Sequence, residues 1–115
     1  MNRIALFALL AYVASASAQD SPLTGTFAVG GRTLVDPPPG ENARSHFRVY
    51  LDGEAAKQLY GLMSAKAERD ECLDDDSVTK RQGGTSCTEL AGGAGFECSF
   101  AIDVDAQRID PASGC

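Results

Sequence analysis

The chain has 115 residues, of which 43% are hydrophobic and 23% charged, and its formal net charge is −6 at pH 7. This length is enough for one small domain, and a domain of this size buries only roughly 60–65% of its unfolded surface, so it usually needs covalent support. The acidic balance argues against nucleic acid as a partner, because phosphates are bound by clusters of Lys and Arg.

Residues 1–18 have the three parts of a secretory signal peptide. Arg3 supplies the positive start, residues 4–13 form a short apolar run, and residues 16–18 (Ala-Ser-Ala) are a small-residue cleavage site. The apolar run is too short to anchor the chain in a bilayer. We therefore expect cleavage before Gln19, no membrane anchor, and a periplasmic or secreted location. Without Arg3 the net charge becomes −7, which suits a basic protein partner.

We expect residues 19–44 to be a flexible N-terminal segment. Two β-prone runs within residues 26–35 flank Gly30-Gly31, a pair that favours a tight hairpin turn with Phe27 opposite Leu34. The alternative is an extended arm without a partner, because an isolated hairpin is only marginally stable. The three prolines of residues 37–39 then predict a stiff linker.

Residues 45–115 are expected to form the folded domain. Residues 46–51 alternate between polar and apolar side chains and predict a strand. Asp52 is a favourable N-cap for a helix over about residues 53–66. Four apolar residues recur at helical spacing in this segment and form one stripe: Ala56, Leu59, Tyr60 and Met63.

The later part of the domain predicts a meander of short strands. Residues 85–90 and 96–102 form a pair joined by the glycine-rich residues 91–95, and residues 78–81 add a short strand before them. Strand, helix and meander together indicate an α+β fold, in which one helix packs on a small antiparallel sheet stapled by disulfides.

The four cysteines, an even number in an exported chain, indicate two disulfides. They are Cys72, Cys87, Cys98 and Cys115. The pairing Cys72–Cys87 with Cys98–Cys115 is slightly favoured, since each bridge closes a loop of about 15 residues and contributes roughly 3 kcal/mol. The alternative is a cross-strand Cys87–Cys98 bridge with Cys72 joined to Cys115. Zinc binding is disfavoured because the chain has no close Cys-x-x-Cys pair.

Residues suited to catalysis are few. His46 is the single histidine. Its neighbour Ser45 should point to the opposite face of the strand, so we expect a surface histidine and no catalytic residue.

Two acidic groups could offer oxygen ligands to calcium. One comprises Asp70-Glu71 and the run Asp74, Asp75 and Asp76, and the other comprises Asp103, Asp105 and Asp110. Neither fits the spacing of the twelve-residue calcium loop, so no metal or cofactor is expected. The charge-dense run Asp74, Asp75 and Asp76 is instead the candidate contact with a protein partner.

Several local patterns occur together between residues 47 and 103. A strand leads into the Ala-rich residues 52–57, and residues 70–72, 79–81, Cys87 and 98–103 follow. This arrangement resembles small, poorly characterised secreted proteins of Gram-negative bacteria, a resemblance that implies a periplasmic or secreted location and brings no activity. Size and compartment are also similar to those of periplasmic lysozyme inhibitors, which insert a Ser-Gly loop into the enzyme; Ser113-Gly114 lacks the flanking tyrosines of that loop.

The sequence therefore predicts an exported, non-enzymatic protein-binding module of the periplasmic-inhibitor or immunity type. An envelope structural or calcium-binding protein is the alternative, and a small hydrolase is less favoured because a catalytic set is missing.

Overall fold

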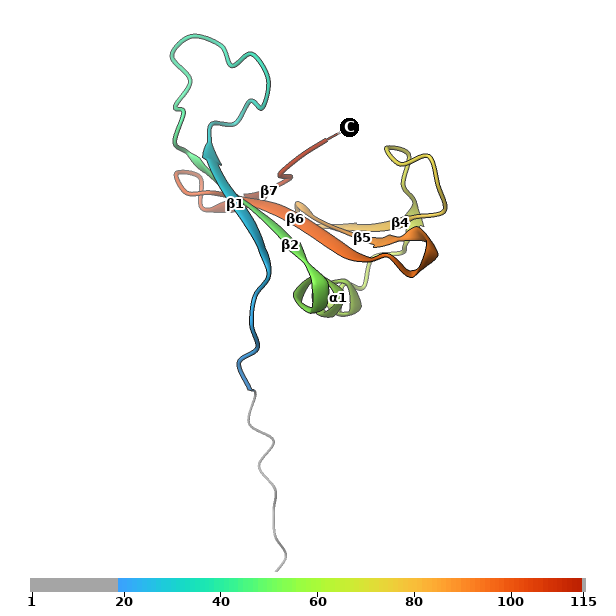
Figure 1. Ribbon diagram of the computed structural model, residues 1–115. Coiled ribbons are helices and arrows are strands. Elements are labelled where there is room, and N and C mark those ends of the chain that lie inside the picture. Colours follow the sequence, from blue (N-terminus) through green and yellow to red (C-terminus); the bar gives the residue numbers. More distant parts are fainter. Residues whose placement is uncertain (1–18, 115) are drawn as a thin grey trace, which may run out of the picture.

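A computed structural model describes residues 19–114 of the chain (Figure 1). The predicted signal peptide and Cys115 lie outside the described residues. In chain order, the elements are β1 (Gly25–Gly30), β2 (His46–Asp52), α1 (Gly53–Leu62), β3 (Glu68–Arg69), β4 (Val78–Gln82), β5 (Thr85–Leu90), a 3-10 turn (Ala91–Gly93), β6 (Gly95–Asp103) and β7 (Arg108–Asp110).

Within residues 19–114, seven strands form one antiparallel sheet, and six of them lie in the order β1-β2-β6-β5-β4-β3. β6 is the longest strand, and β7 pairs with its C-terminal end. α1 lies across one face of this sheet (Figure 1). The predicted α+β class, with one helix on an antiparallel sheet, is confirmed.

The predicted apolar stripe of α1 packs against the sheet. Ala56 and Met63 are buried with Cys87 and Cys98, and partly buried side chains surround them. Those surrounding residues are Leu51, Leu59, Tyr60 and Phe96. Asp52 is at the N-cap position, as expected, although its side chain makes no capping hydrogen bond.

The helix ends at Leu62, four residues earlier than the sequence predicts. Met63 adopts an extended backbone, and its N–H closes the last turn on the carbonyl of Tyr60. Lys80 of β4 donates its Nζ to the carbonyl oxygens of Tyr60 and Met63, each at 3.1 Å. A lysine at the C-terminal end stabilises a helix because its positive charge and N–H donors interact favourably with the last carbonyl groups, which carry partial negative charge.

The hairpin predicted around Gly30-Gly31 is not formed. β1 pairs with β2 along its whole length, so Phe27 is opposite Val49 and not Leu34. A strand gains more from the edge of an existing sheet than from an isolated two-strand hairpin. The sheet therefore begins at Gly25, within the segment that the sequence suggests is flexible.

The disulfide pairing that the sequence slightly favours is wrong. Cys87 on β5 is bonded to Cys98 on β6, and the two residues are direct partners in the strand register. Directly opposite residues of an antiparallel pair share one face, which here is the face under α1. Cys72 is also disulfide-bonded; its pairing with Cys115, which belongs to the alternative with the cross-strand bridge, involves a residue outside the described part of the chain.

Candidate protein-binding surface

The segment between β1 and β2 forms a loop, residues 31–42, that projects beyond the end of the sheet (Figure 1). Its two ends lie close together at the sheet. A Cβ atom placed on Gly31 would be 2.7 Å from the carbonyl oxygen of Asn42, closer than a side-chain carbon can approach. Glycine is therefore required at this position for the loop to close.

Hydrogen bonds within the loop hold its base. The carboxylate of Glu41 accepts two bonds from Thr33, one from the backbone N–H at 3.2 Å and one from the hydroxyl at 2.7 Å. The N–H of Glu41 donates to the carbonyl of Pro38 at 3.2 Å. These contacts fold the proline-rich stretch back toward the sheet, so the expected linker is a closed loop of defined shape.

A buried arginine of the sheet holds the same base from outside. Arg48 of β2 is only 5% exposed, and its Nη2 donates to the carbonyl oxygens of Gly31 at 2.6 Å and Arg32 at 3.5 Å. Its Nε has no hydrogen-bond partner within residues 19–114. Burying a guanidinium is costly unless its donors are used. Here the Nη2 group of Arg48 donates to backbone carbonyls of the loop and so holds the base of the loop in place.

The outer part of the loop presents apolar side chains to solvent. Leu34 is 54% exposed and Val35 is 76% exposed, and three consecutive prolines follow Asp36. Proline restricts the backbone, so such a loop loses little conformational entropy when it binds. The braced loop can therefore contact an apolar recess of another molecule.

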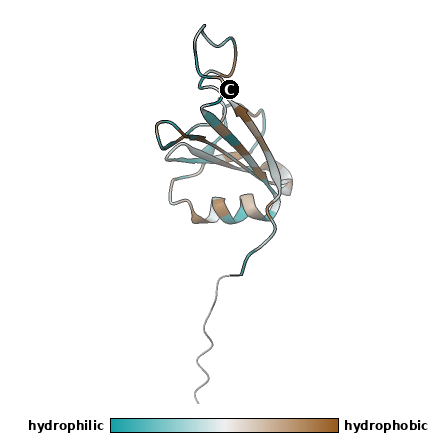
Figure 2. Ribbon diagram, turned by 90° about the vertical axis from the view of Figure 1, so that its left-hand side faces the viewer, coloured by the Kyte–Doolittle hydropathy of each residue, from teal (hydrophilic) through white to brown (hydrophobic). Residues whose placement is uncertain are grey.

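The helix covers only part of the sheet face on which it packs. Two rows of apolar side chains continue across neighbouring strands beyond it, Phe27–Val49–Phe100 and Val29–Phe47–Ile102–Ile109. The exposed members are Phe27, Val29, Phe47, Ile102 and Ile109, and the rings of Phe27 and Phe47 stack with centroids 5.1 Å apart. Figure 2 shows hydrophobic stretches on the strands beyond α1, toward the 31–42 loop. We call these two rows the uncovered apolar rows.

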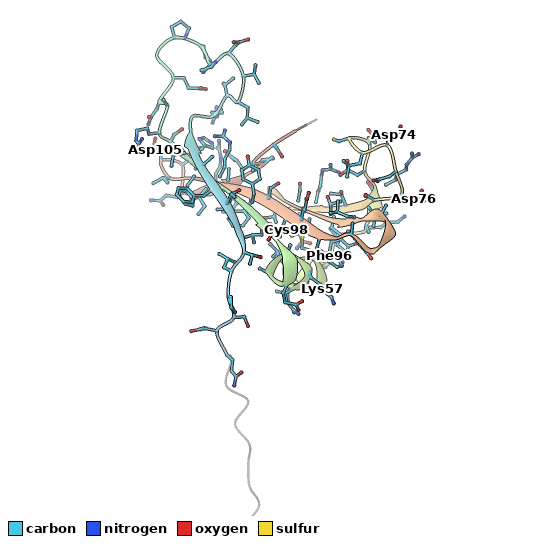
Figure 3. The ribbon with its side chains drawn as sticks, in the orientation of Figure 1. Lys57, Asp74, Asp76, Phe96, Cys98 and Asp105 are labelled. Carbon is cyan, nitrogen blue, oxygen red and sulfur yellow. A yellow bond between two sulfur atoms is a disulfide. The ribbon has the colours of Figure 1, made fainter. Side chains whose placement is uncertain are left out.

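The acidic run singled out by the sequence lies away from the 31–42 loop. Asp74 and Asp76 are at the far side of the sheet from Asp105, which is near that loop (Figure 3). The N–H of Ser77 donates to Asp75 Oδ1 at 2.8 Å, and the hydroxyl and amide of Ser77 hold the pKa of Asp75 below its usual value. The run is exposed, so a role in partner binding stays a prediction.

The acidic run is joined to the sheet through Asp70. This buried carboxylate accepts hydrogen bonds from the Thr79 hydroxyl at 2.5 Å and from the N–H of Cys72 at 2.8 Å. Asp70 and Cys72 also help to line a cavity of about 660 Å³. Its other lining residues include Tyr50, Arg81 and Glu97.

His46 is not the surface residue that the sequence predicts. It is 4% exposed, and the Ser45 hydroxyl lies 2.7 Å from its Nδ1, although alternation along a strand would separate the two side chains. Ser45 precedes β2, which begins at His46, so the rule for neighbouring strand residues does not apply to it.

The loop-bracing role of Arg48 had no signal in the sequence. Strand alternation places Arg48 on a polar face, and nothing local indicates that this position is buried or that carbonyls 16 and 17 residues away accept its hydrogen bonds. Leu34 and Val35 are recognisable in the sequence as β-prone residues, but their pattern predicts a hairpin and not an exposed loop.

Comparisons with known proteins give no assignment: no family model, curated protein or solved structure matches this chain. Across residues 19–114, α1 is the one α-helix, and it is neither long nor apolar enough to cross a bilayer.

Proposed function

We propose that this chain is an exported, non-enzymatic protein-binding module of the periplasmic-inhibitor or immunity type. The observation that carries the proposal is the 31–42 loop, which is fixed at its base and presents Leu34 and Val35 to solvent. Binding loops are commonly found on rigid scaffolds of this kind. The loop would insert its two apolar side chains into a recess of the partner.

The scaffold supports this role because it limits the ordering cost of association. A cross-strand disulfide links β5 to β6, and Arg48 and Glu41 hold the loop before any partner arrives. Preorganisation of this kind raises affinity without new contacts. The disulfides also fit a periplasmic or secreted location, where thiols become oxidised.

The uncovered apolar rows enlarge the proposed contact. Val29 is close to the point where the chain leaves β1 for the loop, and Phe47 is its register partner on β2. Contiguous exposed apolar groups of this kind mark interaction surfaces. A partner that received the loop could also rest on this end of the sheet.

The test is affinity capture from the periplasm of the producing bacterium, followed by measurement of binding to the captured protein. We expect the double variant Leu34→Ser/Val35→Ser to bind at least tenfold more weakly than the unaltered chain. The matched control is Leu23→Ser/Leu62→Ser, which removes two apolar side chains outside the loop that are 71% and 81% exposed. Equal binding by the loop variant and the unaltered chain would overturn the proposal.

The alternatives have separate signatures. A calcium-binding envelope protein would melt at a higher temperature when Ca²⁺ is added, because a ligand that binds the folded state stabilises it. A hydrolase would have an activity that His46→Ala abolishes.

A further inference from the structure

Three side chains that are far apart in the sequence converge on one point near the end of β6. His46 of β2, Asp103 of β6 and Asp110 of β7 each direct one ligand atom to this point, and the three atoms lie within 4.8 Å of one another. His46 Nε2 is 3.0 Å from Asp110 Oδ2 and 3.6 Å from Asp103 Oδ2. His46 and Asp103 are each 4% exposed.

Each of the three side chains is oriented through its other polar atom. The Ser45 hydroxyl contacts His46 Nδ1 at 2.7 Å, the N–H of Ala106 donates to Asp103 Oδ1 at 3.0 Å, and Arg108 Nε donates to Asp110 Oδ1 at 2.8 Å. Groups that orient metal ligands in this way are typical of protein metal sites. The atoms left facing one another are one imidazole nitrogen and two carboxylate oxygens.

We propose that His46, Asp103 and Asp110 bind a divalent first-row transition ion such as Zn²⁺. Bonds of about 2.1 Å in a tetrahedral site place ligand atoms roughly 3.4 Å apart, and the two distances from His46 Nε2 bracket that value. One imidazole with two carboxylates suits these ions, whereas Ca²⁺ takes six to eight oxygens.

The charges and protons of the cluster are compatible with an ion. Two carboxylates balance the charge of a divalent cation. With an ion bound through Nε2, the ring would carry its proton on Nδ1 and donate it in a hydrogen bond to the Ser45 hydroxyl, 2.7 Å away. Arg108 Nη2 lies 3.5 Å from Asp103 Oδ2, and its half-exposed side chain can leave that oxygen while it still donates to Asp110 Oδ1.

The site is reachable from solvent. A hollow of about 330 Å³ is lined by His46 and Asp103, together with Asn42, Asp105 and the base of the 31–42 loop. It supplies a route for the ion and space for a water molecule as the fourth ligand. The proposal does not depend on the proposed function, because it concerns the end of β6 and not the outer part of the loop.

The experiment uses the exported chain with its disulfides intact and without a histidine tag, after treatment with EDTA and dialysis. Zn²⁺ alone is titrated by calorimetry, and the ring signals of His46 are followed by NMR. Because the sequence contains a single histidine, those signals are unambiguous. We expect one Zn²⁺ per chain and a clear shift of the His46 signals.

Two variants of equal charge change make the test specific. Asp110→Asn removes a ligand at a partly exposed position and should weaken Zn²⁺ binding at least tenfold. Asp105→Asn alters a carboxylate of the same hollow that is not in the converging set, and it should bind within twofold of the unaltered chain. Absence of saturable binding, unshifted His46 signals, or equal binding by Asp110→Asn and the unaltered chain would each show that the cluster is only an ion-pair network.

Discussion

Arg48 on β2, a buried residue on the sheet face opposite α1, donates its Nη2 to the carbonyl oxygen of Gly31 at 2.6 Å and so joins the sheet to the start of the 31–42 loop. This contact links the scaffold to the proposed binding element. Together with the hydrogen bonds from Thr33 to Glu41, it holds the base of the loop that carries Leu34 and Val35 beyond the sheet.

Replacement of Arg48 by methionine tests this link. Arg48→Met removes the hydrogen bonds to the loop but also removes a buried charge whose Nε has no hydrogen-bond partner among residues 19–114, so the two effects on stability oppose each other. We expect the free energy of unfolding to change by no more than about 1–2 kcal/mol. Amide exchange within residues 31–42 should become faster. Arg44→Met, at an exposed position just after the loop, is the control; identical exchange in both variants would contradict the bracing role.

The Cys87–Cys98 bridge should stabilise the fold because it restricts the unfolded chain. For a sequence separation of 11 residues, the double variant Cys87→Ala/Cys98→Ala should lose about 2–3 kcal/mol of unfolding free energy, measured by urea denaturation. The pairing itself can be mapped by proteolysis after Glu89 and Glu97, which separates the two cysteines along the chain. A peptide in which Cys72 is linked to Cys87 would contradict the structure.

Asp70 should make stability depend on pH in the acidic range. The Thr79 hydroxyl, and then the backbone N–H of Cys72 and the charge of Arg81, hold the pKa of Asp70 below its usual value, against the opposing effect of burial. A carboxyl whose pKa is lower in the folded state contributes stability above its unfolded pKa of about 4, and loses it as pH falls through the folded value.

Asp70→Asn should therefore lower the unfolding free energy by about 2 kcal/mol near neutral pH, since hydrogen bonds to a charged group are lost. The difference from the unaltered chain should shrink steadily below pH 4 and vanish at the lowest pH. The measurement is chemical denaturation from pH 2 to 7. If the two unfolding free energies differ by a constant amount over this range, the ionised form of Asp70 is not what stabilises the folded state.

The acidic run should speed association with a basic partner. Asp75 accepts the Ser77 N–H, so the informative variant keeps it and changes only its neighbours, Asp74→Asn/Asp76→Asn. We expect slower association at low salt and a weaker salt dependence, because exposed charges act over about 8–10 Å before salt screens them. The melting temperature should hardly change.

The control for this variant is Asp20→Asn/Glu68→Gln, which changes the net charge equally at exposed positions elsewhere. If both double variants associate at the same rate, the effect belongs to net charge and not to the acidic run.

The parts of the fold that depend on neighbouring residues could be predicted from the sequence. The stripe of Ala56 and Met63, the start of α1 after Asp52, and the alternation of β2 and β6 are all present in the structure. Strand alternation does not decide which cysteine bonds to Cys87, because a bridge to Cys72 and a bridge to Cys98 would both close a loop of acceptable length.

Local patterns can be recognised in the sequence without a structure: a helix stripe, strands with two unlike faces, and cysteines suited to disulfides. Three long-range contacts become visible only in the folded chain: β1 pairs with the edge of β2, Arg48 reaches Gly31, and His46 contacts Asp110, 64 residues away. The reason is physical: helix and strand periodicity repeat within a few residues, whereas these contacts depend on the register of strands brought together by the whole sheet.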